Sequence, residues 1–376
     1  MTDIKSAKAL VEGKKVVVSG TFCSFPRRAT LETVIRWFGG KVTTSISKST
    51  DYLIAGDAVG PAKLAQCKEL DIPVVSEEEF VKLMLNDTVV IPDDVVEIAD
   101  GAFERCHGLK HVVIPESVTK IGNSFSECTE LETVELPKSV TSINWQCFYF
   151  CPKLKGIKVD PENPVYSSYN GILLCGEYVF ICPESLPVEK VDLPEGITYV
   201  GGFSKNKFIK EVNIPDGVER IGDGAFSNCC NLEKVSLPDS VEIIDQWAFG
   251  ATGITSITIP EEVNVIKSNT FWSCKSLKSV KLPSSLETIE SKAFEKCVAL
   301  EELEIPDSVE KIESGAFNYC ASLKHVRLPK SLKDLGTSAF SSCNIKSVEL
   351  PKEFKPWNDD IRKYSGFENC EEVITY

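Results

Sequence analysis

Histidine is scarce in this chain, and several catalytic signatures are missing. Three histidines occur in 376 residues, and none lies at a known spacing from a nucleophile. The sequence contains no P-loop, no H-E-x-x-H helix and no K-x-D-G lysine of nucleotidyl transfer. These absences argue against an enzyme, so we expect no catalytic residues and no cofactor.

Long apolar segments are also missing. No apolar run is long enough to cross a bilayer. Residues 1–15, MTDIKSAKALVEGKK, lack the apolar core of a secretory signal. We therefore expect a cytoplasmic protein with no membrane partner.

Basic residues are fewer than acidic residues, and the excess of acidic residues is unevenly distributed along the chain. Residues 1–88 carry 12 Lys/Arg and 11 Asp/Glu, whereas the remainder carries 29 and 44, which gives balances of +1 and −15. The C-terminal part should repel nucleic acid over most of its surface. Any contact with DNA is expected in the first 88 residues.

One phrase recurs from about residue 90 onward, as in IPDGVERIGDGAFSNCCNLEKVSLP and IPDSVEKIESGAFNYCASLKHVRLP. Its prolines are spaced by 21 to 23 residues outside one long gap. This period, with apolar residues at fixed places, indicates a leucine-rich-repeat solenoid. In L-x-x-V-x-L-P, alternate residues such as Leu232, Val235 and Leu237 should face the core of a short strand. Ile221 and Phe226 should fill the opposite wall, and stacked coils complete the core.

Most of the fifteen cysteines fall in the phrase F-x-x-C. Asn206 or Thr252 takes the same place where the phrase breaks, so small residues able to form hydrogen bonds are interchangeable there. This indicates a buried ladder of reduced thiols that caps backbone groups. Parallel Cβ vectors disfavour disulfides. No C-x-x-C pair is present, so we expect no metal site.

These coils resemble the BspA-like leucine-rich repeats of bacterial surface antigens, over roughly residues 90–376. The resemblance implies a scaffold that binds a protein partner and carries out no chemistry. Residues 160–187 contain N-x-x-Y-x-S-x-x-G-x-L, which is similar to a variant coil found between such repeats. Residues 357–376 are expected to cap the last coil.

Outward-facing strand residues form the expected surface for this protein partner. They are polar and mixed in sign, so they give no clear anchor of the Trp, Tyr or Arg type. The set comprises His111, Thr133, Glu135, Lys158, Glu211, Ser256, Thr258, Ser279, Lys281, Glu302, Glu304, His325 and Arg327. Trp145, Trp247 and Trp272 lie near the opposite turn, where we favour packing between neighbouring coils over an exposed patch.

The first 88 residues alternate between strand and helix patterns. Leu31, Val34, Ile35 and Phe38 have helical spacing, and Ser76 and Glu79 have the spacing of a capping box. The order predicts an α/β fold, a four-stranded parallel sheet with flanking helices. Strands are expected at 14–19, 41–47, 51–56 and 72–75, and helices at 28–38, 61–70 and 76–85.

Residues 9–88 are similar to a BRCT domain. GKKVVVSGTF, GGKVTTSISKSTDYLIAG, GPAKLAQCKEL and VSEEEF occur in the order and near the spacing of that family. The types that they resemble most are the single BRCT domains of NAD-dependent DNA ligase and of the large subunit of the clamp loader, replication factor C.

This resemblance implies a phosphate-binding site. Ser19 would donate its hydroxyl, Gly20 its backbone amide and Lys63 its charge, and Arg28 would add the contact that the clamp-loader type makes. Helix N-termini and backbone amides favour an anion. One extra residue lies between Gly20 and Arg28, which leaves the neighbouring Arg27 as an alternative. The other interpretation is that Ser19-Gly20 is only a tight turn and Lys63 a solvated side chain.

Our leading hypothesis is a non-enzymatic adaptor with two modules. The BRCT domain (1–88) would recognise a 5′-phosphorylated DNA end, which we favour, or a phosphoprotein. The solenoid (89–376) would bind a protein. The alternative is a purely protein-binding scaffold with a vestigial phosphate pocket. The partner's identity and the oligomeric state stay open. The short apolar junction at 85–100 predicts that the BRCT domain docks against the first coil.

Overall fold

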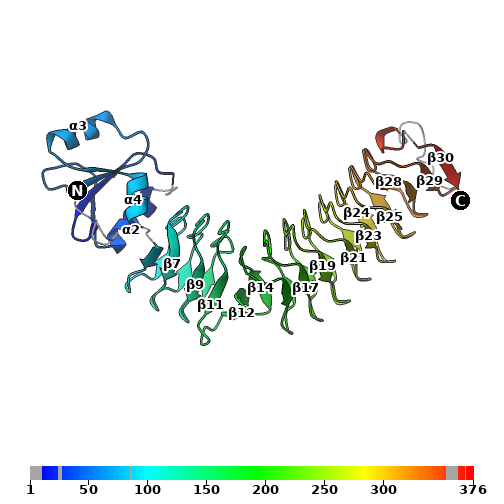
Figure 1. Cartoon of the computed structure of the whole chain (residues 1–376), viewed down its shortest axis with the longest axis horizontal. Coiled ribbons are helices and arrows are strands. Elements are labelled where there is room, and N and C mark those ends of the chain that lie inside the picture. Colours follow the sequence, from blue (N-terminus) through cyan, green and yellow to red (C-terminus); the bar gives the residue numbers. More distant parts are fainter. Residues whose placement is uncertain (1–10, 24–27, 85–86, 353–362, 369) are drawn as a thin grey trace. The chain divides into compact units, whose positions relative to one another are not determined.

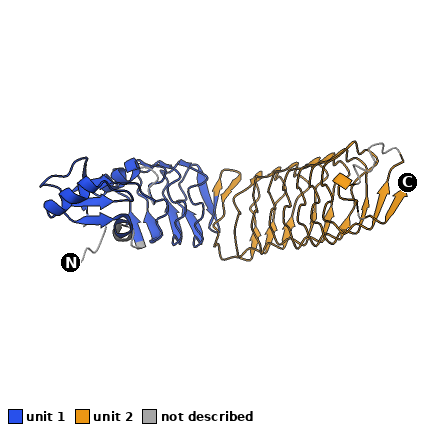
Figure 2. Cartoon of the chain, turned by 90° about the horizontal axis from the view of Figure 1, so that it is seen from above, with its two compact units in different colours: residues 1–173 blue, residues 174–376 orange. Residues whose placement is uncertain are grey.

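A computed structural model describes residues 11–23, 28–84, 87–352, 363–368 and 370–376. The chain forms two compact units, residues 1–173 and residues 174–376, which Figure 2 shows in different colours. Each unit is described by itself. The first contains an α/β sheet and the first coils of the solenoid, and the second contains the remaining coils.

The α/β part of the first unit is a four-stranded parallel sheet, as predicted. The helices that the structure describes here flank this sheet and are labelled in Figure 1. Its strand order is β2-β1-β3-β4, and every pairing is parallel. The elements are β1 (Lys15–Ser19), α2 (Arg28–Trp37), β2 (Lys41–Thr43), β3 (Tyr52–Ala55), α3 (Pro61–Glu69), β4 (Val74–Ser76) and α4 (Glu77–Met84).

Local sequence explains these elements. Leu31, Val34 and Ile35 form the buried face of α2, as their spacing predicts. At the start of α4 the Ser76 amide donates to Glu79 Oε2 at 3.0 Å, and the Glu79 amide donates to Ser76 Oγ at 3.2 Å. This reciprocal capping box starts α4 directly after β4.

The coils of the first unit form two parallel ladders. The long-strand ladder has the order β11-β9-β7-β5, and the short-strand ladder has the order β10-β8-β6. Only the long strands were predicted, because two-residue strands leave no periodicity to detect. The strands are β5 (Asp87–Val90), β6 (Glu97–Ile98), β7 (Leu109–Val113), β8 (Lys120–Ile121), β9 (Thr133–Leu136), β10 (Ser142–Ile143), β11 (Gly156–Val159) and β12 (Tyr166–Tyr169).

The second unit repeats the same design. Strand β13 (Ile172–Cys175) spans the division between the units. The long strands are β15 (Lys190–Asp192), β17 (Glu211–Asn213), β19 (Lys234–Ser236), β21 (Ser256–Thr258), β23 (Ser279–Lys281), β25 (Glu302–Leu303), β27 (His325–Arg327), β29 (Ser347–Leu350) and β30 (Glu372–Thr375). The others are β14 (Tyr178–Ile181), β16 (Tyr199–Val200), β18 (Arg220–Ile221), β20 (Ile243–Ile244), β22 (Val265–Ile266), β24 (Thr288–Ile289), β26 (Lys311–Ile312) and β28 (Asp334–Leu335).

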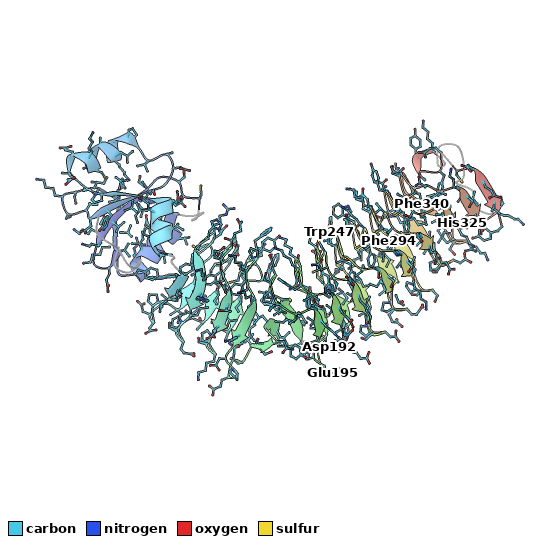
Figure 3. All side chains as sticks on the ribbon, viewed as in Figure 1. Asp192, Glu195, Trp247, Phe294, His325 and Phe340 are labelled. Carbon is cyan, nitrogen blue, oxygen red and sulfur yellow. The ribbon has the colours of Figure 1, made fainter. Side chains whose placement is uncertain are left out.

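Apart from the variant coil at 160–187, the coils each contribute one buried phenylalanine to a stacked column. Adjacent ring centroids lie 4.9 to 5.8 Å apart within each unit. In Figure 3, Phe294 and Phe340 lie on the side of the coils that carries Trp247, away from Asp192 and Glu195. The column contains Phe103, Phe125 and Phe148, and then Phe203, Phe226, Phe249, Phe271, Phe294, Phe317, Phe340 and Phe367. Phe367 carries the column into the described part of the C-terminal segment.

The predicted thiol ladder is confirmed. Seven thiols of the F-x-x-C phrase donate to the carbonyl of the column phenylalanine one coil earlier, with Sγ···O distances of 3.0 to 3.3 Å. The pairs are Cys128–Phe103, Cys151–Phe125, Cys229–Phe203, Cys274–Phe249, Cys297–Phe271, Cys320–Phe294 and Cys343–Phe317. Cys106 and Cys370, at the two ends of the phrase's run, lie nearest to the carbonyls of Glu104 and Glu372 instead. Asn206 replaces cysteine by donating to the Pro183 carbonyl of the preceding coil at 2.8 Å. Thr252 occupies the same sequence position but donates to the Phe249 carbonyl of its own coil at 2.8 Å.

This arrangement predicts how fast the thiols react. All fifteen cysteines lie among the described residues as reduced thiols, but only Cys23 and Cys230 are exposed, and Cys175 and Cys343 are half-buried. We expect two thiols of the native chain to react with a chromogenic disulfide at the rate of an unhindered thiol, two more slowly, and eleven only after unfolding. Rapid modification of more than four thiols in the native protein would contradict the ladder.

Candidate phosphate-binding site

Three of the four predicted phosphate-binding residues lie together at the carboxyl end of β1. Ser19 ends this strand and is almost fully buried. Lys63, in the first turn of α3, donates from Nζ to Ser19 Oγ at 3.2 Å. No side chain among the described residues forms a capping hydrogen bond at Gly60, where α3 begins. We call Ser19, Gly20 and Lys63 the candidate site.

Only glycine fits at position 20. Its φ is +105°, and an added Cβ would lie 2.6 Å from the Asp57 carbonyl oxygen and 2.9 Å from the Gly56 backbone. The Thr21 amide donates to this Asp57 carbonyl at 2.8 Å, which fixes the turn. Among the described residues, none accepts a hydrogen bond from the Gly20 amide. The turn therefore offers a backbone donor beside the Ser19 hydroxyl.

Arg28 does not join this group in the described part of the chain. It is the first residue of α2, and its Nε pairs with Glu32 Oε1 at 2.9 Å. No contact joins Arg28 to Ser19 or Lys63 among the described residues. The Glu32 partner four residues later is a signal that the sequence already contained. Arg27 lies outside the described residues.

An internal carboxylate lies close to the same turn, and sequence reasoning missed it. Glu77, at the start of α4, accepts a hydrogen bond from the Cys23 amide at 2.9 Å. The Cys23 thiol lies 3.9 Å from Asp57 Oδ2. These two carboxylates would repel a bound anion. The groups that would attract it are one lysine, one hydroxyl and one backbone amide, so we expect only modest affinity for phosphate.

Arg105 of the first coil also contacts this segment, and no sequence pattern pointed to it. Its Nη1 lies 3.5 Å from the Cys23 carbonyl oxygen, and its Nε pairs with Glu127 Oε2 at 3.0 Å. The hydrogen bond to Glu127 raises the pKa of the Arg105 guanidinium. The rings of Trp37 in α2 and Phe103 in the first coil lie 6.4 Å apart. The short junction predicts such a contact between the α/β part and the first coil.

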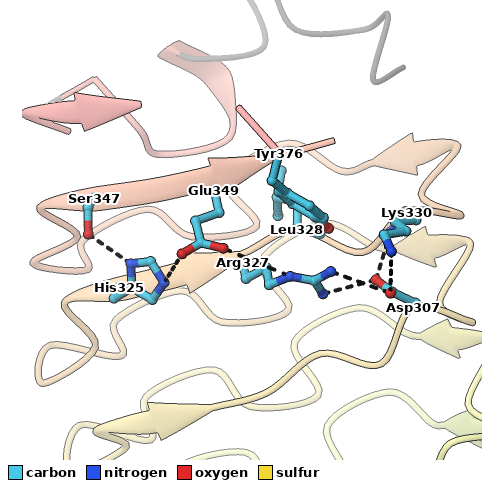
Figure 4. A network of polar contacts seen from close by, with 8 residues as sticks. All are labelled: Asp307, His325, Arg327, Leu328, Lys330, Ser347, Glu349 and Tyr376. Carbon is cyan, nitrogen blue, oxygen red and sulfur yellow. Dashed lines mark hydrogen bonds and ion pairs between the residues drawn. The ribbon is translucent and has the colours of Figure 1, made fainter. Parts of the chain in front are cut away.

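The outward-facing strand surface of the second unit includes a polar network near its C-terminal end (Figure 4). Arg327 Nη1 bonds to Asp307 Oδ1 at 2.9 Å, and the guanidinium carbon lies 4.2 Å from the Tyr376 ring centroid. His325 Nδ1 lies 2.8 Å from Ser347 Oγ. Arg327 is therefore engaged in contacts within the chain. It does not provide the arginine anchor for a protein partner that the outward-facing strand surface lacks.

The three tryptophans behave differently from one another. Trp247 and Trp272 pack between neighbouring coils, with ring centroids 5.3 Å apart, as predicted. The same prediction is wrong for Trp145, which is 65% exposed. Its turn contains two further exposed aromatic residues, Tyr149 and Phe150, and the coils on either side of it contain no tryptophan.

A family model for the BspA type leucine-rich repeat region matches residues 74–201, 166–254 and 244–374 in six copies. The chain belongs to the BspA type leucine-rich repeat family. A second family model, for the BRCT domain, matches residues 9–84. Both resemblances expected from the sequence are thereby confirmed.

Several DNA ligases are similar to the N-terminal BRCT segment of this chain. The DNA ligase of Flavobacterium johnsoniae is 51% identical over 69 residues, which are 18% of this chain and 10% of the ligase. The DNA ligase of Desulfitobacterium hafniense is 49% identical over 72 residues, which are 19% of this chain and 11% of the ligase. The chain thus spans about a tenth of the length of these relatives.

Solved structures share the solenoid fold. A leucine-rich cell surface protein of Faecalibacterium prausnitzii aligns with a TM-score of 0.52 and 28% identity, covering 61% of this chain and 62% of that one. A leucine-rich repeat protein of Eubacterium ventriosum aligns with a TM-score of 0.59 and 21% identity, covering 74% and 87%. Both alignments support the solenoid fold of the repeats.

Two further features bear on function. Within the described ranges, no group of three or more His, Cys, Asp or Glu side chains could hold a metal ion. No helix in those ranges has the length and apolar character needed to span a membrane.

Proposed function

We propose that this chain is a non-enzymatic adaptor with two binding modules. Its BRCT domain, residues 1–88, recognises a phosphate group on a DNA end or on a protein. Its solenoid, residues 89–376, binds a protein partner. The variant coil at 160–187 and the C-terminal cap belong to the solenoid in this proposal.

One observation carries the phosphate part of this proposal. Lys63 Nζ bonds to Ser19 Oγ at 3.2 Å, next to a glycine whose conformation no other residue fits. An ammonium, a hydroxyl and a backbone amide converge where a parallel strand ends and a helix begins. Such groups complement the oxygens of a phosphate monoester. Arg28 would join them only by leaving Glu32.

Substitutions at the candidate site should weaken phosphate binding. Ser19→Ala removes one hydrogen bond to a charged group, so we expect a roughly tenfold loss of affinity. Lys63→Ala removes the charge and should cost roughly tenfold or more. The measurement is fluorescence anisotropy with the full chain, using a 5′-phosphorylated duplex and a phosphoserine peptide as separate probes.

Lys68→Ala is the matched control, because this lysine lies in the last turn of the same helix. It should change the affinity for either phosphorylated probe by less than about twofold. Equal binding of phosphorylated and dephosphorylated probes, in the wild type, would refute phosphate recognition. DNA affinity should also be weak and fall with salt, since few phosphate contacts release few counterions.

A purely protein-binding scaffold is the second candidate. Glu77 already occupies the Cys23 amide, and Arg28 is already paired. In that case the site is vestigial, and protein binding by the solenoid survives Ser19→Ala and Lys63→Ala unchanged. A pulldown with the full chain and with the double variant separates the two functions.

We also propose a cytoplasmic location. Support comes from the reduced thiols, which are typical of a reducing compartment. The similar protein of Faecalibacterium prausnitzii, in contrast, is a cell surface protein. Cell fractionation tests the proposal, and recovery of the chain at the cell surface with oxidised Cys23 or Cys230 would reject it.

A further inference from the structure

The third coil of the first unit carries three exposed aromatic side chains in one turn, which we call the aromatic turn. It comprises Trp145, Tyr149 and Phe150, which are 65%, 42% and 43% exposed. The Tyr149 and Phe150 rings meet edge to face, with centroids 4.2 Å apart. Aromatic residues of this kind are enriched at the anchoring points of protein interfaces.

Corresponding positions in other coils show that the fold does not require these aromatics. The position of Trp145 is serine in the coils of Phe271, Phe294 and Phe317. The position of Tyr149 is serine in the coils of Phe125, Phe226 and Phe340. The position of Phe150 has a positive φ in ten coils, from 56° to 66°. Bulky side chains tolerate this conformation poorly, and asparagine tolerates it well.

The aromatic turn is linked by a chain of contacts to Cys23, which lies three residues after Gly20 of the candidate site. Arg105 touches the Cys23 carbonyl and pairs with Glu127 of the next coil. The Glu127 amide in turn donates to the Tyr149 carbonyl at 2.7 Å. Adjacent coils stack at the spacing of neighbouring strands, so the aromatic turn begins about 10 Å from Arg105.

Charge decides which kind of partner fits this surface. Residues 89–173 carry seven basic and twelve acidic residues, a balance of −5. A polyanion such as single-stranded DNA would be repelled along the coils even though its bases could stack on the aromatics. A peptide with one phosphate and a nearby apolar side chain meets no such barrier.

We propose that the aromatic turn is the docking surface for an apolar side chain of a phosphorylated protein segment whose phosphate binds at Ser19, Gly20 and Lys63. This inference rests on the proposed function and selects a phosphoprotein over the DNA end. An extended peptide rises about 3.3 Å per residue, so about three residues span the roughly 10 Å from Arg105 to the aromatic turn. The added stretch from Ser19 to Cys23, which Arg105 contacts, places the apolar residue roughly four to eight residues from the phosphorylated one.

The test uses fluorescent phosphoserine peptides of glycine, serine and alanine, with one tryptophan placed at each position up to eight residues on either side. The full chain should bind peptides with tryptophan in one narrow window roughly tenfold more tightly than the peptide without it. The triple variant Trp145→Ser, Tyr149→Ser, Phe150→Asn should lose this preference and keep its dependence on phosphate. Tyr319→Asn changes an exposed aromatic at the same position of a distant coil and should have no effect.

The melting temperature of the triple variant distinguishes a docking role of the three aromatic residues from a structural role. Because Phe150→Asn relieves a bulky residue at positive φ, the triple variant should melt at or above the temperature of the wild type. A clear fall in melting temperature assigns the aromatics to the fold and overturns the proposal. An unchanged tryptophan preference in the triple variant overturns it as well.

Two further outcomes are distinguishable. Tighter binding of a 5′-phosphorylated single strand than of any peptide, lost in the triple variant, replaces the phosphoprotein with nucleic acid and rejects the inference. If Ser19→Ala leaves every affinity unchanged, the proposed phosphate recognition fails, while the tryptophan preference still reports on the aromatic turn alone.

Discussion

Replacing Phe294 with alanine is expected to destabilise the second unit by about 3–5 kcal/mol. Phe294 is fully buried, and its ring lies 5.1 Å from those of Phe271 and Phe317. Both neighbours are held by their own coils, so the cavity cannot collapse. In a solenoid each coil depends on its neighbours, so one gap interrupts the core of the whole unit.

Urea denaturation followed by circular dichroism measures this loss. Phe208→Ala is the matched control, since Phe208 is 45% exposed in the same unit and should cost less than about 1 kcal/mol. A loss below about 1 kcal/mol for Phe294→Ala would contradict the view that the phenylalanine column forms the core.

Raising the pH above about 9 is expected to unfold the coils through their buried thiols. Burial raises the pKa of Cys147 and of Cys229 to about 12, and it also raises the pKa of Cys128 and Cys320 well above 9.0. Their neutral forms are favoured in the folded chain, so their contribution to stability is complete below the unfolded pKa. Above pH 9 each such thiol should cost about 1.4 kcal/mol per pH unit, until the folded pKa is reached.

The double variant Cys229→Thr, Cys320→Thr tests this prediction against other alkaline effects. Thr252 already fills the same place in another coil, so the variant should fold. Its free energy of unfolding should fall less steeply from pH 9 to 11 than that of the wild type. Identical slopes would show that the thiols do not govern alkaline stability.

The coils were largely predictable from the sequence because each position repeats in register. The buried faces of Leu232 and Val235, the column at Phe226 and the thiol ladder all follow from one phrase. The short-strand ladder was not predictable, because two residues such as Arg220–Ile221 show no periodicity of their own.

The BRCT segment was predictable in its elements and only partly in its site. Ser19, Gly20 and Lys63 lie together as the resemblance implies. Arg28 is paired with Glu32 instead, a local interaction that a family pattern does not contain. Contacts between distant segments, such as Glu77 with Cys23, depend on tertiary packing that no sequence window shows.

Aromatic residues were the hardest to place. Trp247 and Trp272 contact each other from adjacent coils, whereas the coils on either side of Trp145 contain no tryptophan. The sequence shows the tryptophans but not which of them has a ring beside it. Which tryptophan side chain is exposed is therefore visible only in the structure.

The central claim is that Ser19, Gly20 and Lys63 hold a phosphate group, and the Gly20 amide tests it most directly. Its resonance can be followed in the NMR spectrum of the full chain while phosphoserine is added, with sulfate at equal ionic strength as the control. We predict a saturable downfield shift of the Gly20 amide proton with phosphoserine, lost in Lys63→Ala. A Gly20 resonance that does not move, or that moves equally with sulfate, would contradict the claim.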